Sequence, residues 1–71
     1  MDELDSIRER IKKNRLSFVW LIHQLSARGI ETDKTEISSI FAGSRKGAKA
    51  EEIIQTSHVI MDEYEKSFFH V

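Results

Sequence analysis

The chain of 71 residues contains no cysteine, no proline and only three glycines. Without cysteine, neither a disulfide framework nor a thiolate metal site can stabilise the fold. The longest apolar run, residues 18–22, is far too short to span a membrane, and the acidic N-terminal stretch is not typical of a secretory signal. We therefore expect one small, soluble, cytoplasmic domain with a modest core and no membrane association.

Catalytic and metal-binding patterns are also lacking. The three histidines, His23, His58 and His70, do not have the spacing to one another or to carboxylates that a metal site requires. The adjacent acidic pairs at 51–52 and 62–63 would point in different directions on a helix, whereas a catalytic carboxylate pair must face one site. We expect no enzyme, no metal ion and no cofactor.

Apolar residues recur at helical spacing along the whole chain, which predicts an all-α domain of four or five helices. Residues 2–14 form the first expected helix, because Leu4, Ile7 and Ile11 share one face. Residues 48–68 form either one long helix or two helices that join near positions 57 and 58.

The expected C-terminal helix carries more apolar residues than one packed face needs. One stripe runs from Ala50 to Phe68, and Val59 and Ile60 add a second. The second stripe, together with Phe69 and Val71, is available to another copy of the chain. We therefore expect a homodimer.

Residues 17–43 form the central unit of the chain. Ser17 is a suitable N-cap for a helix over 18–28, and Gly29 is a suitable left-handed residue after it. Thr32 or Asp33 can cap a second short helix over 33–42. Two short helices with this connection are typical of a helix-turn-helix, in which the second helix reads DNA.

The second short helix has a polar face that suits this role. Its side chains hydrogen-bond readily and fall away from the apolar stripe of Ile37 and Ile40, as base-edge contacts require. The residues of this face are Lys34, Thr35, Ser38 and Ser39. Arg45 and Lys46 follow in a glycine-flanked loop that is suited to phosphate contacts.

Charge is distributed unevenly, although the formal net charge is only −1. Ten of the eleven Lys and Arg residues lie within residues 8–49, against four acidic residues there. The other acidic residues gather at the two ends of the chain. We therefore predict a basic side and an acidic side in the folded protein.

The residues of this unit resemble the Cro/C1-type helix-turn-helix family of small bacterial and phage repressors. The resemblance covers roughly residues 7–64. It is carried by Ser17, Leu21, Ile22 and Leu25 and by the stretch 33–43, which has the isoleucine and glycine pattern of the family's third helix.

The resemblance implies a repressor-like, sequence-specific transcription regulator of a prophage or another mobile element. Such a protein binds double-stranded DNA as a dimer, with its third helix in the major groove. By the resemblance, Lys34, Thr35 and Ser39 would stand at base-reading positions. It would place Ser17, Arg45 and Lys46 near the phosphates.

Two alternatives remain open from the sequence. Phe18 and Trp20 stand where the family usually has polar residues, so the fold could serve a protein-binding modulator or antirepressor that acts through this apolar surface. Trp20 belongs either to that surface or to the core. A component of a toxin–antitoxin or conjugation-control system is the other alternative, because it would have the same sequence features.

Overall fold

The computed structural model describes residues 3–69, and the side chains of residues 4–67. This part of the chain forms four α-helices and no strand, which confirms the all-α prediction. The helices are α1 (Glu3–Lys13), α2 (Phe18–Ala27), α3 (Lys34–Phe41) and α4 (Ala48–Phe69). Asp2, His70 and Val71, and the side chains of Phe68 and Phe69, lie outside the described part, so the predicted contacts of Phe69 and Val71 with a second subunit do too.

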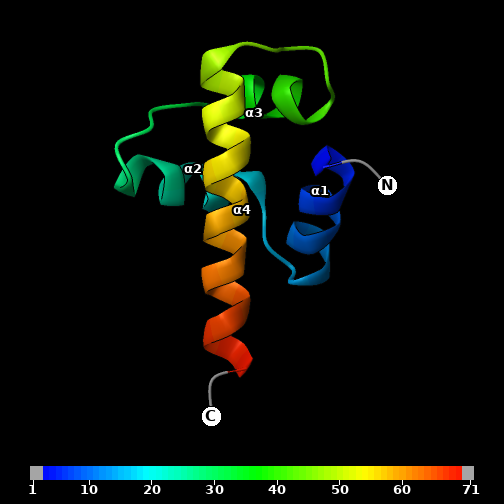
Figure 1. Ribbon diagram of the computed structural model, residues 1–71, viewed down its shortest axis with the longest axis vertical. Coiled ribbons are helices and arrows are strands. Elements are labelled where there is room, and N and C mark those ends of the chain that lie inside the picture. The colour runs from blue at the N-terminus through cyan, green and yellow to red at the C-terminus, as the bar shows by residue number, and fades with distance from the viewer. Residues whose placement is uncertain (1–2, 70–71) are drawn as a thin grey trace.

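The long helix α4 forms the axis of the molecule (Figure 1). Its 22 residues correspond to a length of about 33 Å. It is continuous through Ser57 and His58, so of the two alternatives for this stretch the structure has the single helix. The helices α1 and α2 pack against α4, and α3 packs against both α1 and α2.

Every helix contributes to one core. The apolar faces expected on α1, α2 and α3 are buried, as are residues of α4 at helical spacing. The buried apolar residues are Ile7, Ile11, Leu21, Leu25, Ile37, Ile40, Phe41, Ala50, Ile53, Ile54, Ile60 and Met61. Each fully buried large side chain stabilises the fold by about 2 kcal/mol before the entropy of ordering is counted.

The second apolar stripe expected on α4 is not present as a continuous surface. Ile60 belongs to the core, whereas the neighbouring Val59 is 45% exposed. Val19 of α2, 49% exposed, is the other large apolar side chain that the described residues leave open to solvent. The extra apolar residues therefore enlarge the core, apart from these isolated valines.

The first three helices end in the same hydrogen-bonded motif. In each, the residue after the C-cap has a left-handed backbone, and the next N–H donates to the carbonyl five residues back. Gly29 (φ 86°) fills the left-handed position after α2, as predicted, and Gly43 (φ 82°) fills it after α3. After α1 the position is held by Arg15 (φ 59°), so a side chain stands where glycine is usual.

The helix starts are defined by side-chain caps. Ser17 Oγ accepts a hydrogen bond from the Trp20 N–H at 3.2 Å, which confirms the predicted cap of α2. Of the two candidates at α3, Asp33 is the cap, and its carboxylate accepts from the Glu36 N–H at 2.7 Å. Thr32 instead donates its hydroxyl to the Glu36 carboxylate at 2.6 Å.

Ion pairs join α1 and α2 to the C-terminal half of α4. Arg10 Nη2 lies 2.7 Å from Asp62 Oδ1 and 2.9 Å from Glu65 Oε1. Asn14 also donates to Glu65, at 3.0 Å. Beyond the end of α2, Arg28 Nη2 lies 2.6 Å from Glu63 Oε1. These contacts tie α1 and the end of α2 to the C-terminal half of α4.

The Arg10–Glu65 contact makes folding depend on pH. The hydrogen bond from Arg10 is the main cause that holds the pKa of the Glu65 carboxyl below its ordinary value. A carboxyl with a lowered pKa in the folded state contributes stability above its unfolded pKa of about 4.5 and loses it as the pH falls through the folded value.

We therefore expect Glu65→Gln to destabilise the protein more at pH 7 than at pH 3, because pH 3 lies below the unfolded pKa and the contribution of the carboxylate is already reduced there. Urea unfolding followed by circular dichroism measures the difference. Glu52→Gln is the matched control, because Glu52 is exposed on the same helix and has no ion pair with any described residue. An equal loss for Glu65→Gln at both pH values would contradict this role.

Ser57 is the one fully buried polar side chain among the described residues, and its hydroxyl has no hydrogen-bond partner there. A buried unsatisfied hydroxyl costs about 1–3 kcal/mol, and alanine is the better helix former. Ser57→Ala should therefore raise the free energy of unfolding by about 1 kcal/mol in urea titrations. Ser38→Ala, on an exposed helix face, should change it by no more than about 0.5 kcal/mol. A destabilised Ser57→Ala protein would show that the hydroxyl has a partner in solution.

Candidate nucleic-acid interface

The polar face predicted on the third helix exists in α3. Lys34, Thr35 and Ser38 are exposed, Ser39 is half-buried, and the opposite face is buried. None of these four side chains makes a hydrogen bond or ion pair with a described residue. Their donors and acceptors are therefore free to meet a ligand.

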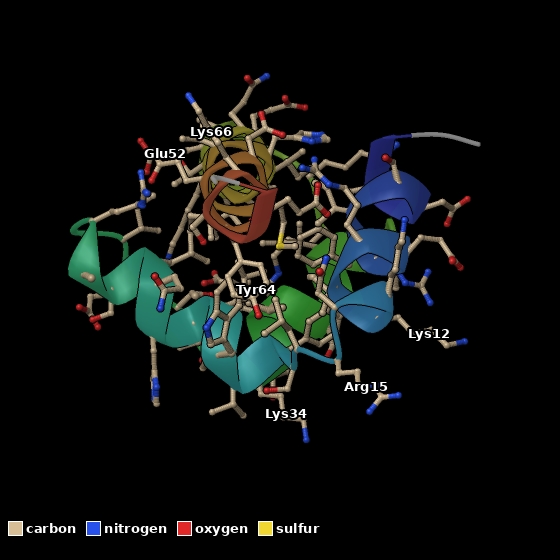
Figure 2. The ribbon with its side chains drawn as sticks, turned by 90° about the horizontal axis from the view of Figure 1, so that it is seen from below. Lys12, Arg15, Lys34, Glu52, Tyr64 and Lys66 are labelled. Atoms are coloured by element: carbon tan, nitrogen blue, oxygen red, sulfur yellow. The ribbon has the colours of Figure 1, made fainter. Side chains whose placement is uncertain are left out.

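Three cations from neighbouring segments lie on one side of the molecule. Figure 2 shows Lys12 at the end of α1, Arg15 in the following turn and Lys34 at the start of α3 projecting away from α4. None of them forms an ion pair with a described residue. We refer to Lys12, Arg15 and Lys34 as the basic face.

The opposite side has a different charge pattern. Glu52 and Lys66 project from α4 away from the basic face (Figure 2). The acidic residues near the end of α4 pair with Arg10 and Arg28, so these two arginines are not available on the basic face. The cations of the basic face, by contrast, form no ion pair with a described residue and have no labelled acidic neighbour in Figure 2.

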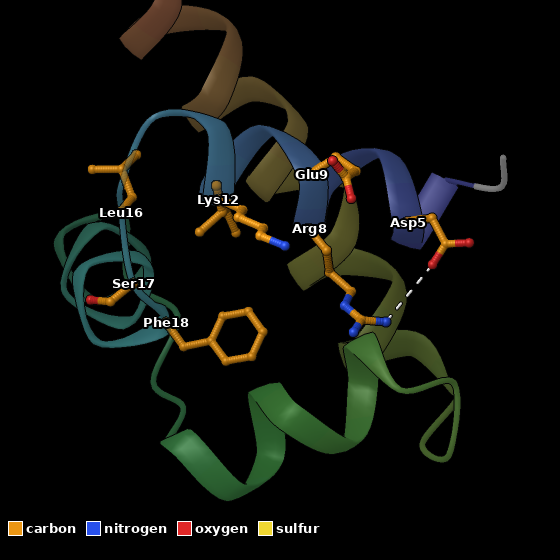
Figure 3. A pocket seen from close by; sticks show the side chains of 8 residues that line it. Asp5, Arg8, Glu9, Lys12, Leu16, Ser17 and Phe18 are labelled. Carbon is orange, nitrogen blue, oxygen red and sulfur yellow. Dashed lines mark ion pairs between the residues drawn. The ribbon is translucent and has the colours of Figure 1, made fainter.

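A groove of about 560 Å³ lies between α1 and the start of α2, beside α3 (Figure 3). Ser17 and Phe18 line it from α2, and Arg8 and Lys12 reach over it from α1. Arg8 is paired with Asp5 at 3.8 Å, whereas Lys12 has no ion pair with any described residue. The Ser17 hydroxyl accepts from the backbone of its own helix, which leaves its hydrogen able to donate.

The loop after α3 places its two cations in different environments. Lys46 is exposed and forms no ion pair with a described residue. Arg45 Nη1 lies 3.1 Å from Glu36 Oε2, and Lys49 Nζ lies 3.1 Å from Glu36 Oε1. Of the two loop residues expected to contact phosphates, Lys46 therefore has no ion pair with a described residue, whereas Arg45 is paired with Glu36 of α3.

The two aromatic residues considered as a partner surface pack within the chain. The Phe18 ring stacks on the buried Phe41 ring, with centroids 5.6 Å apart and planes at 16°. The Trp20 ring meets Tyr64 edge to face at 5.3 Å. Both side chains are half-buried, so each belongs to the border of the core rather than to an open apolar patch.

Comparison with other proteins identifies no relative, since no family model, curated protein or solved structure matches this chain. Within residues 3–69 no three His, Asp or Glu side chains come together as a metal site requires. None of the described helices combines the length and apolar character that crossing a membrane requires.

The sequence alone did not identify Lys12 and Arg15 as site residues. Both residues are plainly basic in the sequence. That they lie on the same side of the molecule as Lys34 depends on how α1 packs against α3, which the sequence does not show. The contacts of Glu36 were not predicted from the sequence either. A signal was present, because Glu36 stands three residues after the Asp33 cap and Arg45 of the basic loop follows nine residues later.

The packing of Trp20 leads to a testable prediction. Trp20→Ala removes the edge-to-face contact with Tyr64 and part of the core border, so the free energy of unfolding should fall by about 2 kcal/mol. Val19→Ala on the exposed face of α2 is the control and should cost less than about 1 kcal/mol. Unchanged stability of Trp20→Ala in urea unfolding would contradict this packing and favour a partner surface.

Proposed function

We propose that the protein binds double-stranded DNA through α3 and the basic face, and that it regulates transcription as a sequence-specific repressor. The helices α2 and α3 would act as a helix-turn-helix of the Cro/C1 type. In this arrangement α3 enters the major groove, which is wide enough for one helix, while neighbouring segments contact phosphates.

The observation that carries the proposal is the set of cations without ion pairs around a polar helix face. Lys12 of α1, Arg15 of the following turn and Lys34 of α3 project to one side (Figure 2). Uncompensated cations attract the phosphate backbone and release counterions on binding. The net charge of the whole chain does not oppose this, because Glu52 projects away from the basic face and Asp62, Glu63 and Glu65 pair with arginines.

The side chains of α3 supply the groups that sequence recognition needs. Lys34 can donate to guanine acceptors, and the hydroxyls of Thr35 and Ser38 can donate to or accept from base edges. Ser39, half-buried, would contribute less to base contacts than these three. Ser17, Lys46 and Arg45 would position the helix by contacting the backbone.

Regulation would follow from occupancy of a promoter by two copies of the chain. A dimer places two copies of α3 about 34 Å apart, one helical turn of DNA, on a two-fold symmetric site. We propose this dimer because a single helix of eight residues reads too few base pairs for a specific site.

Selection of binding sequences from random duplex DNA tests this function directly. Enrichment of a palindrome with half-sites one turn apart would support a dimeric regulator. Enrichment of a single short site would support a monomer, and no retention of any duplex at low salt would contradict DNA binding.

Variants separate base contacts from phosphate contacts. Lys34→Ala and Thr35→Ala should weaken binding to the selected site by about tenfold or more and change affinity for a scrambled duplex less. Lys12→Ala and Lys46→Ala should weaken binding to both duplexes and reduce the slope of log K against log salt by about 0.9 each. Fluorescence anisotropy at several salt concentrations measures both effects.

Lys66→Ala is the matched control, because Lys66 is exposed and projects from α4 away from the basic face (Figure 2). It removes the same charge and should leave the slope and the affinity within error of the wild type. A loss for Lys66→Ala equal to that for Lys12→Ala would show that total charge, not the basic face, determines binding.

The alternative of a protein-binding modulator or antirepressor has less support. It requires Phe18 and Trp20 at an open surface, and both rings pack on aromatic residues of the same chain. It becomes the better account if the Trp20→Ala protein keeps its stability and loses a partner.

A further inference from the structure

Glu36 occupies an unusual place on α3. It is the only acidic residue within this helix, and it stands two positions from Lys34 and one from Thr35. A carboxylate so close to a proposed DNA-reading surface repels phosphates. How much of this repulsion remains depends on the contacts that the carboxylate makes.

The carboxylate is fully engaged by three donors. Oε1 accepts from the Thr32 hydroxyl at 2.6 Å and lies 3.1 Å from Lys49 Nζ, while Oε2 lies 3.1 Å from Arg45 Nη1. The Glu36 side chain is 16% exposed, against 50% for Arg45 and 55% for Lys49. We refer to Glu36, Arg45 and Lys49 as the Glu36 cluster.

The cluster is charged at neutral pH. The hydrogen bond from Thr32, followed by that from Lys49, holds the pKa of the Glu36 carboxyl below its ordinary value. One anion therefore offsets one of the two cations, and the loop after α3 is tied to the start of that helix.

We infer that Glu36 is a positioning residue that limits how strongly the loop after α3 and the start of α4 attract phosphates, and so raises the share of DNA affinity that depends on sequence. The inference rests on the proposed DNA binding. It deepens that proposal by naming which residue sets the balance between specific and non-specific affinity.

The physical reason is counterion release. Non-specific affinity and its salt dependence grow with the number of phosphates that cations neutralise. Arg45 and Lys49 can each neutralise a phosphate only at the expense of their contact with Glu36. Lys46, which has no ion pair with any described residue, contributes without this competition.

The closing experiment compares wild-type and Glu36→Gln proteins on the selected and scrambled duplexes over a range of salt concentrations. Glutamine preserves an oxygen that can accept from Thr32, and it suits this position of a helix, so the fold is retained. The slope of log K against log salt should become steeper by about 0.9, and the scrambled duplex should bind about threefold to tenfold tighter near 0.1 M salt. The ratio of specific to non-specific affinity should fall.

Two further variants isolate the charge effect. In Glu36→Gln/Arg45→Gln the released cation is removed, so the slope should return to that of the wild type. Lys49→Ala should reduce the slope by less than Lys46→Ala does, because Glu36 already offsets Lys49. This second comparison keeps a native Glu36 and remains informative even if the Glu36→Gln protein unfolds.

Thr32→Val is the control for a purely structural role. It removes the hydrogen bond of Thr32 to the carboxylate but leaves both ion pairs, so stability falls and the slope stays unchanged. A Glu36→Gln slope equal to or shallower than the wild type, with the scrambled duplex bound no tighter, overturns the inference while DNA binding stands. Failure of the wild type to bind any duplex overturns the proposed function and this inference together.

Discussion

The position of α3 depends on the burial of one apolar stripe of α4 against α1 and α2. Ile53 and Met61 of that stripe are fully buried, and α3 packs on the two helices that cover it. The stacking of Phe18 on Phe41 adds a direct connection between α2 and α3. A short helix of eight residues is not stable by itself in water, so its polar face is held in place by this packing. Because α1, α2 and α3 all pack around α4 or on the helices that cover it, all four helices contribute buried residues to one core.

Ion pairs then determine where free charge remains. Arg10 and Arg28 face α4 and pair with its acidic residues. Lys12 and Arg15 project away from α4 and have no ion pair with a described residue. The net charge of −1 therefore conceals a basic face. Near α3, Glu36 pairs with Arg45 and Lys49 and offsets part of their positive charge. The proposed interface therefore contains both unpaired cations and cations that are paired with a carboxylate.

Much of this fold was predictable because its local signals are strong. The caps at Ser17 and Asp33, the glycine at position 29 and the spacing of apolar residues determine the first three helices. The continuity of α4 was not decided by the sequence, because Ser57 and His58 are poor helix formers that burial overrides. The contact of Trp20 with Tyr64 and the ion pairs of Glu36 with Arg45 and Lys49 join different helices or loops. They depend on how these segments pack, which the spacing of apolar residues does not specify.

The most direct test of the central claim is a titration of ¹⁵N-labelled protein with duplex DNA at low salt, followed by NMR. We expect amide shifts to concentrate at the start of α3, in residues 12–18 and in residues 44–47, with the outer face of α4 around Glu52 and Lys66 unchanged. Shifts centred on that outer face of α4, or no shifts with any duplex, would contradict the account.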